Sequence, residues 1–178
     1  MMVDHVLTFT VPAAYSLLPP AMRSDKATAM LLAVGLHESD GFSARRQYNR
    51  GPAHGFWQFE RTGTRGVLEH PRSEAAAAEV IAALRYQLPT ATPARQALEV
   101  FEAVTHNDTL ACCLARLLLW TLPVPLPAED DPSAAWAQYV QGWKPGAVTK
   151  GTDEDRIRLR AHFYHCYAEA WGRVNAAT

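Results

Sequence analysis

Residues 31–60, LLAVGLHESDGFSARRQYNRGPAHGFWQFE, decide the fold that the sequence predicts. The pattern is typical of the end of a buried helix, an Arg-rich loop and then a Gly/aromatic segment that forms a short β-hairpin near residues 51–60. Ala27, Leu31, Val34 and Glu38 are spaced i, i+4, i+7 and i+11, so they lie on one helical stripe. Glu38 is therefore expected at the carboxyl end of a helix, on the face turned to the core.

This position predicts unusual chemistry for Glu38. Partial burial disfavours the charged carboxylate, and the negative end of the helix dipole does the same, so both effects raise the pKa. A carboxylic acid that holds its proton near neutral pH is suited to general acid catalysis. The alternative is an ordinary helix-end carboxylate turned to water.

Two motifs in this stretch resemble those of the lytic transglycosylases and goose-type lysozymes. They are Glu-Ser-Asp-Gly-Phe at 38–42 and Ala-His-Gly-Phe-Trp-Gln at 53–58. The family's pattern is Glu-Ser-x-Phe followed by Gly-Ala-x-Gly-Leu-Met-Gln. The first motif is one residue longer here because of Asp40-Gly41, and Pro52 stands where the second usually has Gly.

The resemblance implies a mainly α, lysozyme-like single domain over residues 1–178. It places the catalytic acid at Glu38 and a substrate-cleft glutamine at Gln58, with Ser39 and Phe56 as further substrate-binding positions. A third motif, AQYVQGWKPGAV at 137–148, resembles Ala-Tyr-Asn-x-Gly-Pro-Gly and adds Tyr139 to the binding residues.

Glycoside cleavage often needs a second carboxylate, and Asp40 and Glu60 are the candidates near Glu38. Asp40 precedes Gly41 and is typical of a turn. An alternating pattern would place Glu60 on one strand face with Phe56 and Gln58. Trp57 and Phe59 would then face the opposite way, where core packing is favoured over sugar stacking. The resemblance implies that one glutamate can suffice, because lytic transglycosylases use the muramic acid 6-hydroxyl as the internal nucleophile.

Composition limits the classes of function. The 178 residues are 48% hydrophobic, which is enough for a core, and the net charge of −1 argues against a nucleic-acid partner. Five arginines between Gly41 and Gly66, against the single acid Glu60, are expected to attract an anionic ligand. Arg45 and Arg50 are the predicted contacts to lactyl or peptide carboxylates.

The cysteines and histidines predict no metal centre and no disulfide. Cys112, Cys113 and Cys166 are an odd set with two adjacent members, so we expect reduced thiols. His162, His165 and Cys166 share a helical spacing that metal ligands can have, but packing is the favoured interpretation. His37 and His54 flank the predicted site, where they either bind substrate or face water. No motif for a cofactor is present.

The first 22 residues are not typical of a signal peptide or a membrane span, because Asp4, His5 and Pro12 interrupt their apolar stretches. No membrane insertion is therefore expected. A cell-wall enzyme without a signal would need another route, such as release of a phage endolysin through a holin, or carriage in a virion. The sequence leaves the oligomeric state open.

Capping residues and periodicity predict about seven helices and one small β element. Residues 1–22 are expected to form a short strand or extended segment and a brief helix. The apolar segment 110–120 is expected to form a central buried helix. One stripe of the last helix should pack inward, formed by Ile157, Ala161, Tyr164, Ala168 and Trp171. The other helices are expected at about 25–38, 64–69, 74–87, 93–104 and 132–142, the last helix starting at a capping box formed by Thr152 and Asp155.

Two functions from different classes follow. The leading hypothesis is an enzyme that cleaves the glycan strands of peptidoglycan, with Glu38 as general acid. The alternative is an inactive glycan-binding or structural protein that keeps the same frame. A cleft that carries both Glu38 and Gln58 on its wall would favour the enzyme.

Overall fold

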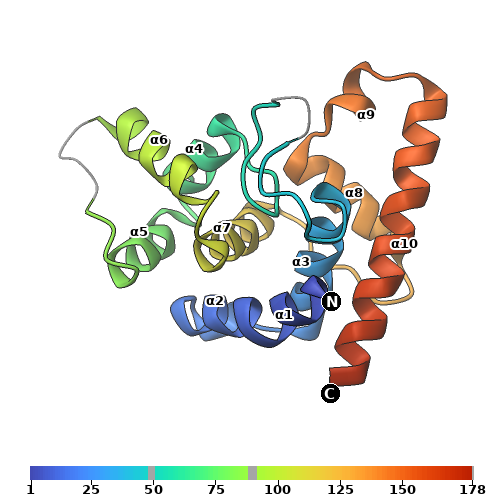
Figure 1. The fold of residues 1–178 in the computed structure, drawn as a ribbon, viewed down its shortest axis with the longest axis horizontal. Helices are drawn as coiled ribbons and strands as arrows, with labels where there is room; N and C mark the ends of the chain where they lie inside the picture. Colours follow the sequence, from blue (N-terminus) through green and yellow to red (C-terminus); the bar gives the residue numbers. More distant parts are fainter. Residues whose placement is uncertain (48–50, 88–91, 178) are drawn as a thin grey trace.

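A computed structural model describes residues 1–47, 51–87 and 92–177, and these residues are mainly helical (Figure 1). The α-helices are α1 (Met2–His5), α2 (Val11–Leu17), α3 (Asp25–Glu38), α4 (Arg61–Glu69), α5 (Glu74–Ala83), α6 (Pro93–Ala103), α7 (Asp108–Thr121), α8 (Pro132–Trp143), α9 (Gly146–Lys150) and α10 (Asp153–Ala177). A π-helical turn, Val6–Thr10, joins α1 to α2, and a 3-10 turn, Pro20–Met22, precedes α3. No helix in the described ranges combines the length and apolar character that crossing a bilayer requires.

Helix α3 confirms the predicted bounds. The Ser24 side chain accepts a hydrogen bond from the Ala27 N–H, which caps the amino end. Every residue from Ala27 to Leu36 is buried, so α3 is enclosed on all faces and is more central than a single apolar stripe would make it. Glu38 is its last residue and emerges from this enclosed segment.

Helix α7 is the second buried helix, as its apolar sequence predicts. Leu114 and Leu117 are fully buried and Leu118 is partly buried. The sequence predicts Asp108 as its cap, but the cap is Asn107, whose side-chain oxygen accepts a hydrogen bond from the Leu110 N–H. Asp108 lies in the first turn, where an acidic residue favours the positive end of the helix dipole.

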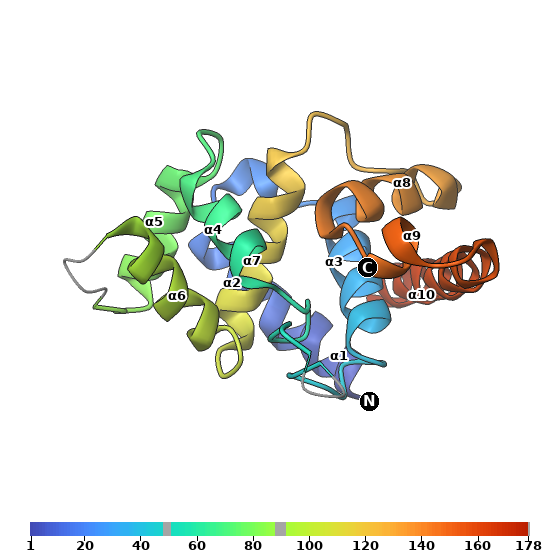
Figure 2. The same ribbon diagram turned by 90° about the horizontal axis from the view of Figure 1, so that it is seen from above.

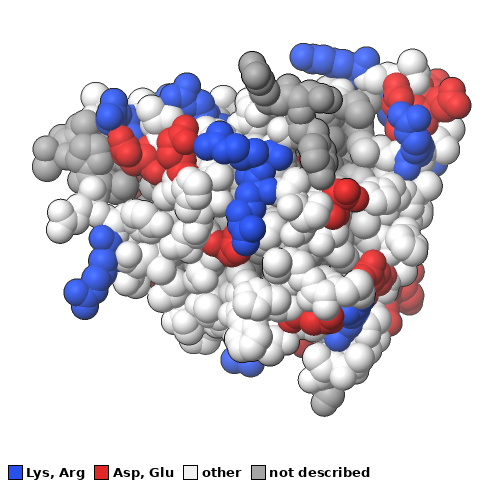
Figure 3. Space-filling model, in the orientation of Figure 1, with Lys and Arg blue, Asp and Glu red and all other residues white. Residues whose placement is uncertain are grey.

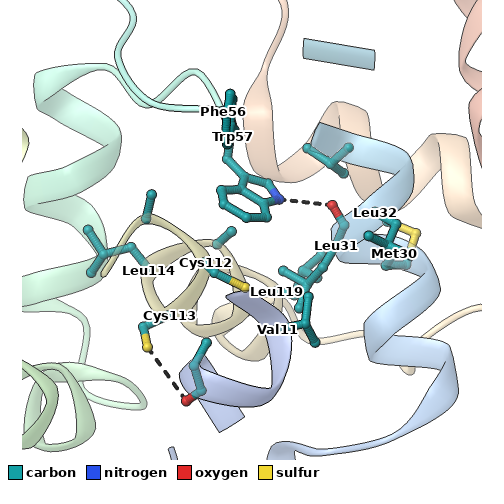
Figure 4. Packing of buried hydrophobic residues seen from close by; sticks show 14 of the residues in the cluster. Val11, Met30, Leu31, Leu32, Phe56, Trp57, Cys112, Cys113, Leu114 and Leu119 are labelled. Carbon is teal, nitrogen blue, oxygen red and sulfur yellow. Dashed lines mark hydrogen bonds between the residues drawn. The ribbon is translucent and has the colours of Figure 1, made fainter. Parts of the chain in front are cut away.

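Apart from α1 and α2, the other helices gather on two sides of α3 and α7. Helices α4, α5 and α6 lie on one side, while α8, α9 and α10 lie on the other (Figures 1 and 2). The long helix α10 packs along α3. Between the two sides, the Trp57 indole reaches α3 and donates to the Leu31 carbonyl at 2.9 Å (Figure 4).

The strand or extended segment expected at the amino terminus is wrong, because helix begins at Met2 and continues to Leu17, well beyond the brief helix that was expected. The β-branched residues of this segment favour a strand, but burial decides otherwise. Val3, Val6, Thr10 and Ala14 are buried at spacings of three or four residues, which is a helical period. Packing against α7 therefore overrides local propensity.

The predicted β-hairpin at 51–60 is also wrong, since this segment contains isolated bridges and no strand. His54 and Phe59 exchange two backbone hydrogen bonds of 2.8 Å across a tight turn. The ladder stops there because the Ala53 carbonyl accepts a hydrogen bond from the Gln47 N–H, and because Glu60 is already the N-cap residue of α4. Gly55 makes the turn at φ +72, where a Cβ would meet the Val104 carbonyl.

The predicted inner stripe of α10 is wrong in its first half, although Trp171 is buried as expected. Ile157 is 60% exposed, and Ala161 and Ala168 are exposed. The buried face is instead formed by Phe163, Cys166, Tyr167, Ala170, Trp171 and Val174. The first turns of α10 carry no buried residue, so an apolar side chain there has no core to join, and the periodic pattern alone did not reveal this. The capping box of Thr152 and Asp155 is confirmed by reciprocal bonds of 3.1 Å.

Candidate active site

A cleft of about 610 Å³ opens where α3 ends. Its walls come from the end of α3, the 53–60 turn, α4, and the carboxyl ends of α7 and α8. Glu38, Gln58, Glu60 and Tyr139 all line it. The cleft therefore brings together residues from all three sequence motifs.

Glu38 is held in the cleft wall by a side chain from α8. The Tyr139 hydroxyl donates a hydrogen bond of 2.6 Å to Glu38 Oε1. Tyr139 is itself 1% exposed, and its ring stacks on Phe163 of α10 with 4.8 Å between centroids. Because a buried aromatic stack fixes Tyr139, the carboxyl group of Glu38 has a fixed anchor on one oxygen.

The environment raises the pKa of Glu38 to about 7, mainly because burial penalises the charged form. The Tyr139 hydrogen bond acts in the opposite direction, and the negative charge of Glu60 adds to the rise. The pKa of Tyr139 is also raised, by burial and by the adjacent carboxyl group, so the phenol keeps its proton. Glu38 is thus a carboxyl group that exchanges its proton near neutral pH.

Gln58 shapes the cleft through an unusual backbone conformation, at φ 46. Its amide nitrogen donates 2.8 Å to the Gly55 carbonyl, inside the same turn. This bond commits the amide N–H to the protein, so the amide oxygen is the group that Gln58 retains for a ligand.

The two candidates for a second carboxylate lie in different places. Glu60 is exposed and lines the cleft with Glu38. Asp40 is exposed in a turn at φ 51, outside the cleft lining. A left-handed turn residue is what the Asp-Gly pair favours, so Asp40 has the role of a turn former.

Ser39 and Phe56 lie outside the cleft, contrary to what the motifs implied. The Ser39 hydroxyl donates 2.7 Å back to the Gly35 carbonyl, which satisfies it within the buried end of α3. Phe56 is fully buried and packs edge-on against Phe42. Trp57 is buried too and has the packing role favoured for it, whereas Phe59 is buried but also lines the cleft.

The arginines near the cleft are largely paired with acids. Arg45 forms a two-pronged ion pair with Asp108, at 3.1 and 2.7 Å, and lies over the Phe56 ring. Arg65 pairs with Glu69 on the exposed face of α4. Acidic and basic side chains accordingly lie next to each other on the face drawn in Figure 3. Arg45 therefore stabilises the loop, and Arg50 lies outside the described residues.

Sequence reasoning missed two cleft residues at the end of α8, Trp143 and Lys144. The Trp143 indole donates 2.8 Å to the Trp57 carbonyl, so it ties α8 to the 53–60 turn. Lys144 ends α8 in a left-handed conformation at φ 50 and lines the cleft. Their signal was the helix-ending sequence Gly-Trp-Lys-Pro-Gly at 142–146, which begins three residues after Tyr139.

The two histidines expected beside the site have different environments. His54 is buried, stacks on Phe101 and bonds the Thr105 hydroxyl at 2.9 Å, so it belongs to the packing between the turn and α6. His37 lines the cleft edge-on to Tyr139. Burial and the neighbouring His162 lower the pKa of His37 to about 4, which keeps it neutral at pH 7.

In the part of the chain that the structure describes, one group of three side chains is close enough to share a metal ion. His37, His162 and Cys166 offer ligand atoms within 4.8 Å of one another. The two histidines already face each other, with 2.9 Å between their Nδ1 atoms, and Cys166 Sγ lies 3.8 Å from His162 Nε2. We assign these contacts to packing between α3 and α10.

Comparison with protein families, curated proteins and solved structures found no match for this chain.

Proposed function

We propose that this protein has a lysozyme-like fold and cleaves the glycan strands of peptidoglycan, with Glu38 as the general acid. One observation carries the proposal: a carboxyl group with a pKa of about 7 lies in a cleft wall and is anchored through one oxygen by Tyr139. The other oxygen is left to carry a proton toward a ligand. A carboxyl group tuned in this way matches the requirement for protonating a leaving alkoxide.

The proposed reaction uses Glu38 twice. Glu38 gives its proton to the glycosidic oxygen as the bond from that oxygen to C1 of MurNAc breaks, and GlcNAc leaves as an alcohol. The resulting carboxylate then takes a proton from the attacking hydroxyl. If the attacking group is the MurNAc 6-hydroxyl, the product is an anhydro end; if it is water, the product is a reducing end.

Glu60 is the residue that would hold such a water. It lines the same cleft, is exposed, and its charge acts on Glu38. Two carboxyl groups with different environments on one cleft fit the division into an acid and a base. As a cell-wall enzyme, the protein would act after holin-type release or as part of a virion.

Digestion of purified cell-wall sacculi tests this function. The unmodified protein should release muropeptides, and Glu38→Gln should lower the rate by about 10²- to 10⁴-fold, because the amide keeps the shape but has no acidic proton. Mass spectrometry of the fragment ends separates anhydro from reducing products.

Glu60→Gln is the matched control, since it removes a second carboxylate from the same cleft. If both Glu60→Gln and Glu38→Gln are inactive and the ends are reducing, hydrolysis with Glu60 as base is supported. If Glu60→Gln alone is inactive, Glu38 is not the essential acid. If the unmodified protein releases nothing from sacculi of several bacterial types, an inactive glycan-binding protein becomes the better description.

A further inference from the structure

Arg116 is a buried cation on α7 that no carboxylate neutralises within the described part of the chain. The residue is 2% exposed. Its Nε donates 2.8 Å to the Met22 carbonyl, which precedes α3, and this is its only hydrogen bond to a described residue. The two terminal nitrogens of the guanidinium therefore make no such bond, although each carries donors.

This arrangement is costly for the protein alone. Burial lowers the pKa of Arg116, but a guanidinium keeps its proton at any physiological pH. Buried charges are normally paired with an opposite charge, and here the Met22 carbonyl and the Trp120 ring compensate only part of the lost hydration. A partner from outside the chain would remove this cost.

The Arg116 side chain lines a pocket of about 570 Å³ that has the features of an anion site. A second arginine, Arg72, lines the same pocket, and its guanidinium donates a 3.4 Å hydrogen bond to the Leu122 carbonyl. Both guanidinium groups lie against the Trp120 ring, 5.4 Å from its centroid for Arg116 and 5.7 Å for Arg72. Two cations that line one pocket thus contact the same aromatic ring.

The rest of the pocket is mostly apolar. Leu119, Leu122, Val124 and Leu126 contribute to its walls, together with the neighbouring prolines. Leu122 also lines the cleft that contains Glu38, so the two hollows are neighbours. A ligand that fits must combine an anionic head with a compact apolar body.

We propose that this pocket binds a carboxylate carried on a small, partly apolar molecule such as the end of a short peptide, with Arg116 and Arg72 as the anion-binding residues. The planar guanidinium fork matches the two oxygens of a carboxylate. Apolar walls suit a carbon-bearing ligand better than a fully hydrated free phosphate. The site does not depend on the glycosidase proposal, because it can be occupied whether or not Glu38 is catalytic.

Three probes distinguish binding of a carboxylate from binding of an uncharged analogue or of any anion. N-acetylalanine carries a carboxylate and a methyl group, its amide N-acetylalaninamide has nearly the same shape without the charge, and inorganic phosphate is an anion without an apolar body. NMR titration of the indole N–H signals reports directly on Trp120. N-acetylalanine should move the Trp120 signal with saturation, and the amide should leave it in place. Saturable binding of phosphate with the same signal, without binding of N-acetylalanine, would overturn the choice of a carboxylate ligand.

Two variants and a control complete the test. Arg116→Met keeps the length of the side chain and removes the buried charge, and Arg72→Gln removes the second cation. Each should weaken N-acetylalanine binding by at least about tenfold, the loss expected for a charge-assisted hydrogen bond. Arg160→Gln removes an exposed arginine on α10 and should bind as the unmodified protein does.

Stability measurements show whether Arg116 is only structural. A ligand that binds only the folded state stabilises it. Added N-acetylalanine should therefore raise the Tm of the unmodified protein and leave the Tm of Arg116→Met unchanged. No ligand-dependent change in either protein, together with a lower Tm for Arg116→Met, would mean that Arg116 serves only the Met22 carbonyl, and the proposal would be rejected.

Discussion

The protonation of Glu38 depends on groups from distant parts of the chain. Burial at the end of α3 raises the pKa, while the hydroxyl of Tyr139 on α8 lowers it. The resulting pKa of about 7 reflects both effects. Exposing Glu38 to solvent should therefore lower its pKa, whereas removing the Tyr139 hydrogen bond should raise it.

Replacing Tyr139 with Phe removes the hydrogen bond and keeps the ring stack. Because that bond favours the charged carboxylate, its loss should raise the pKa of Glu38 above about 7. The carboxyl carbon of Glu38, followed by NMR as a function of pH, measures this directly. An unchanged or lower pKa would contradict the role given to Tyr139.

Glu38 also makes stability depend on pH. Between its ordinary pKa of 4.5 and about 7, the folded state holds a proton that the unfolded state has released. The free energy of unfolding should therefore fall as pH rises through this window, by up to the order of 3 kcal/mol. Glu38→Gln lacks this dependence, so denaturant unfolding should show its stability rising relative to the unmodified protein as pH increases.

The unmodified protein must be compared with Glu38→Gln because the adjacent residue, His37, also makes stability depend on pH. A His pKa lowered to about 4 makes the folded state lose stability as pH falls below the ordinary value of 6.5. Both proteins retain His37, so its contribution cancels in the difference. A difference that does not vary with pH would show that Glu38 titrates normally.

The sequence predicted which segments surround the cleft better than it predicted which side chains point into it. Glu38, Gln58 and Tyr139 meet in one cleft, as their motifs implied. Ser39 and Phe56 belong to the same motifs but turn inward, because a hydroxyl at a helix end bonds the preceding turn and a large ring is most stable in the core. Motif spacing fixes a position along the chain, whereas packing fixes where the side chain points.

At the scale of elements, caps predicted where helices begin more reliably than periodicity predicted which face is buried. Ser24 and the pair Thr152 and Asp155 act locally, so their neighbours in sequence determine the outcome. The buried face of α10 depends on α3, which lies more than a hundred residues earlier in the chain. Long-range packing of this kind leaves no local trace in the sequence.

Helix α3 tolerates no extra atom at Gly35. A Cβ added there would overlap the Phe42 ring, which is itself buried. Gly35→Ala should therefore lower the free energy of unfolding by about 1–3 kcal/mol, despite the higher helix propensity of alanine. Denaturant unfolding at constant pH measures the change.

Gly172→Ala is the control for this substitution. Gly172 also lies within a helix, α10, but a Cβ there would meet no atom within 4 Å. The same replacement should stabilise the protein by up to about 1 kcal/mol. If both variants changed stability in the same direction, the packing of Phe42 on Gly35 would not be the cause.

At the scale of the whole molecule, one continuous hydrophobic core includes residues from Val3 to Val174. Neither side of the cleft has an independent core, so we expect the chain to unfold as a single domain. Tryptophan fluorescence and far-ultraviolet circular dichroism should then give coincident denaturation curves. Two separated transitions would divide the chain at the cleft and contradict a single domain.

The hydrogen bond from Tyr139 to Glu38 joins residues 101 positions apart, and this separation has a consequence for synthesis. A ribosome that adds about 5–20 residues per second completes Tyr139 roughly 5–20 seconds after Glu38. Until then the nascent chain has the carboxylate but not the aromatic wall that shields and anchors it. The environment that raises the pKa of Glu38 is thus completed late during translation, after most of the chain has been synthesised.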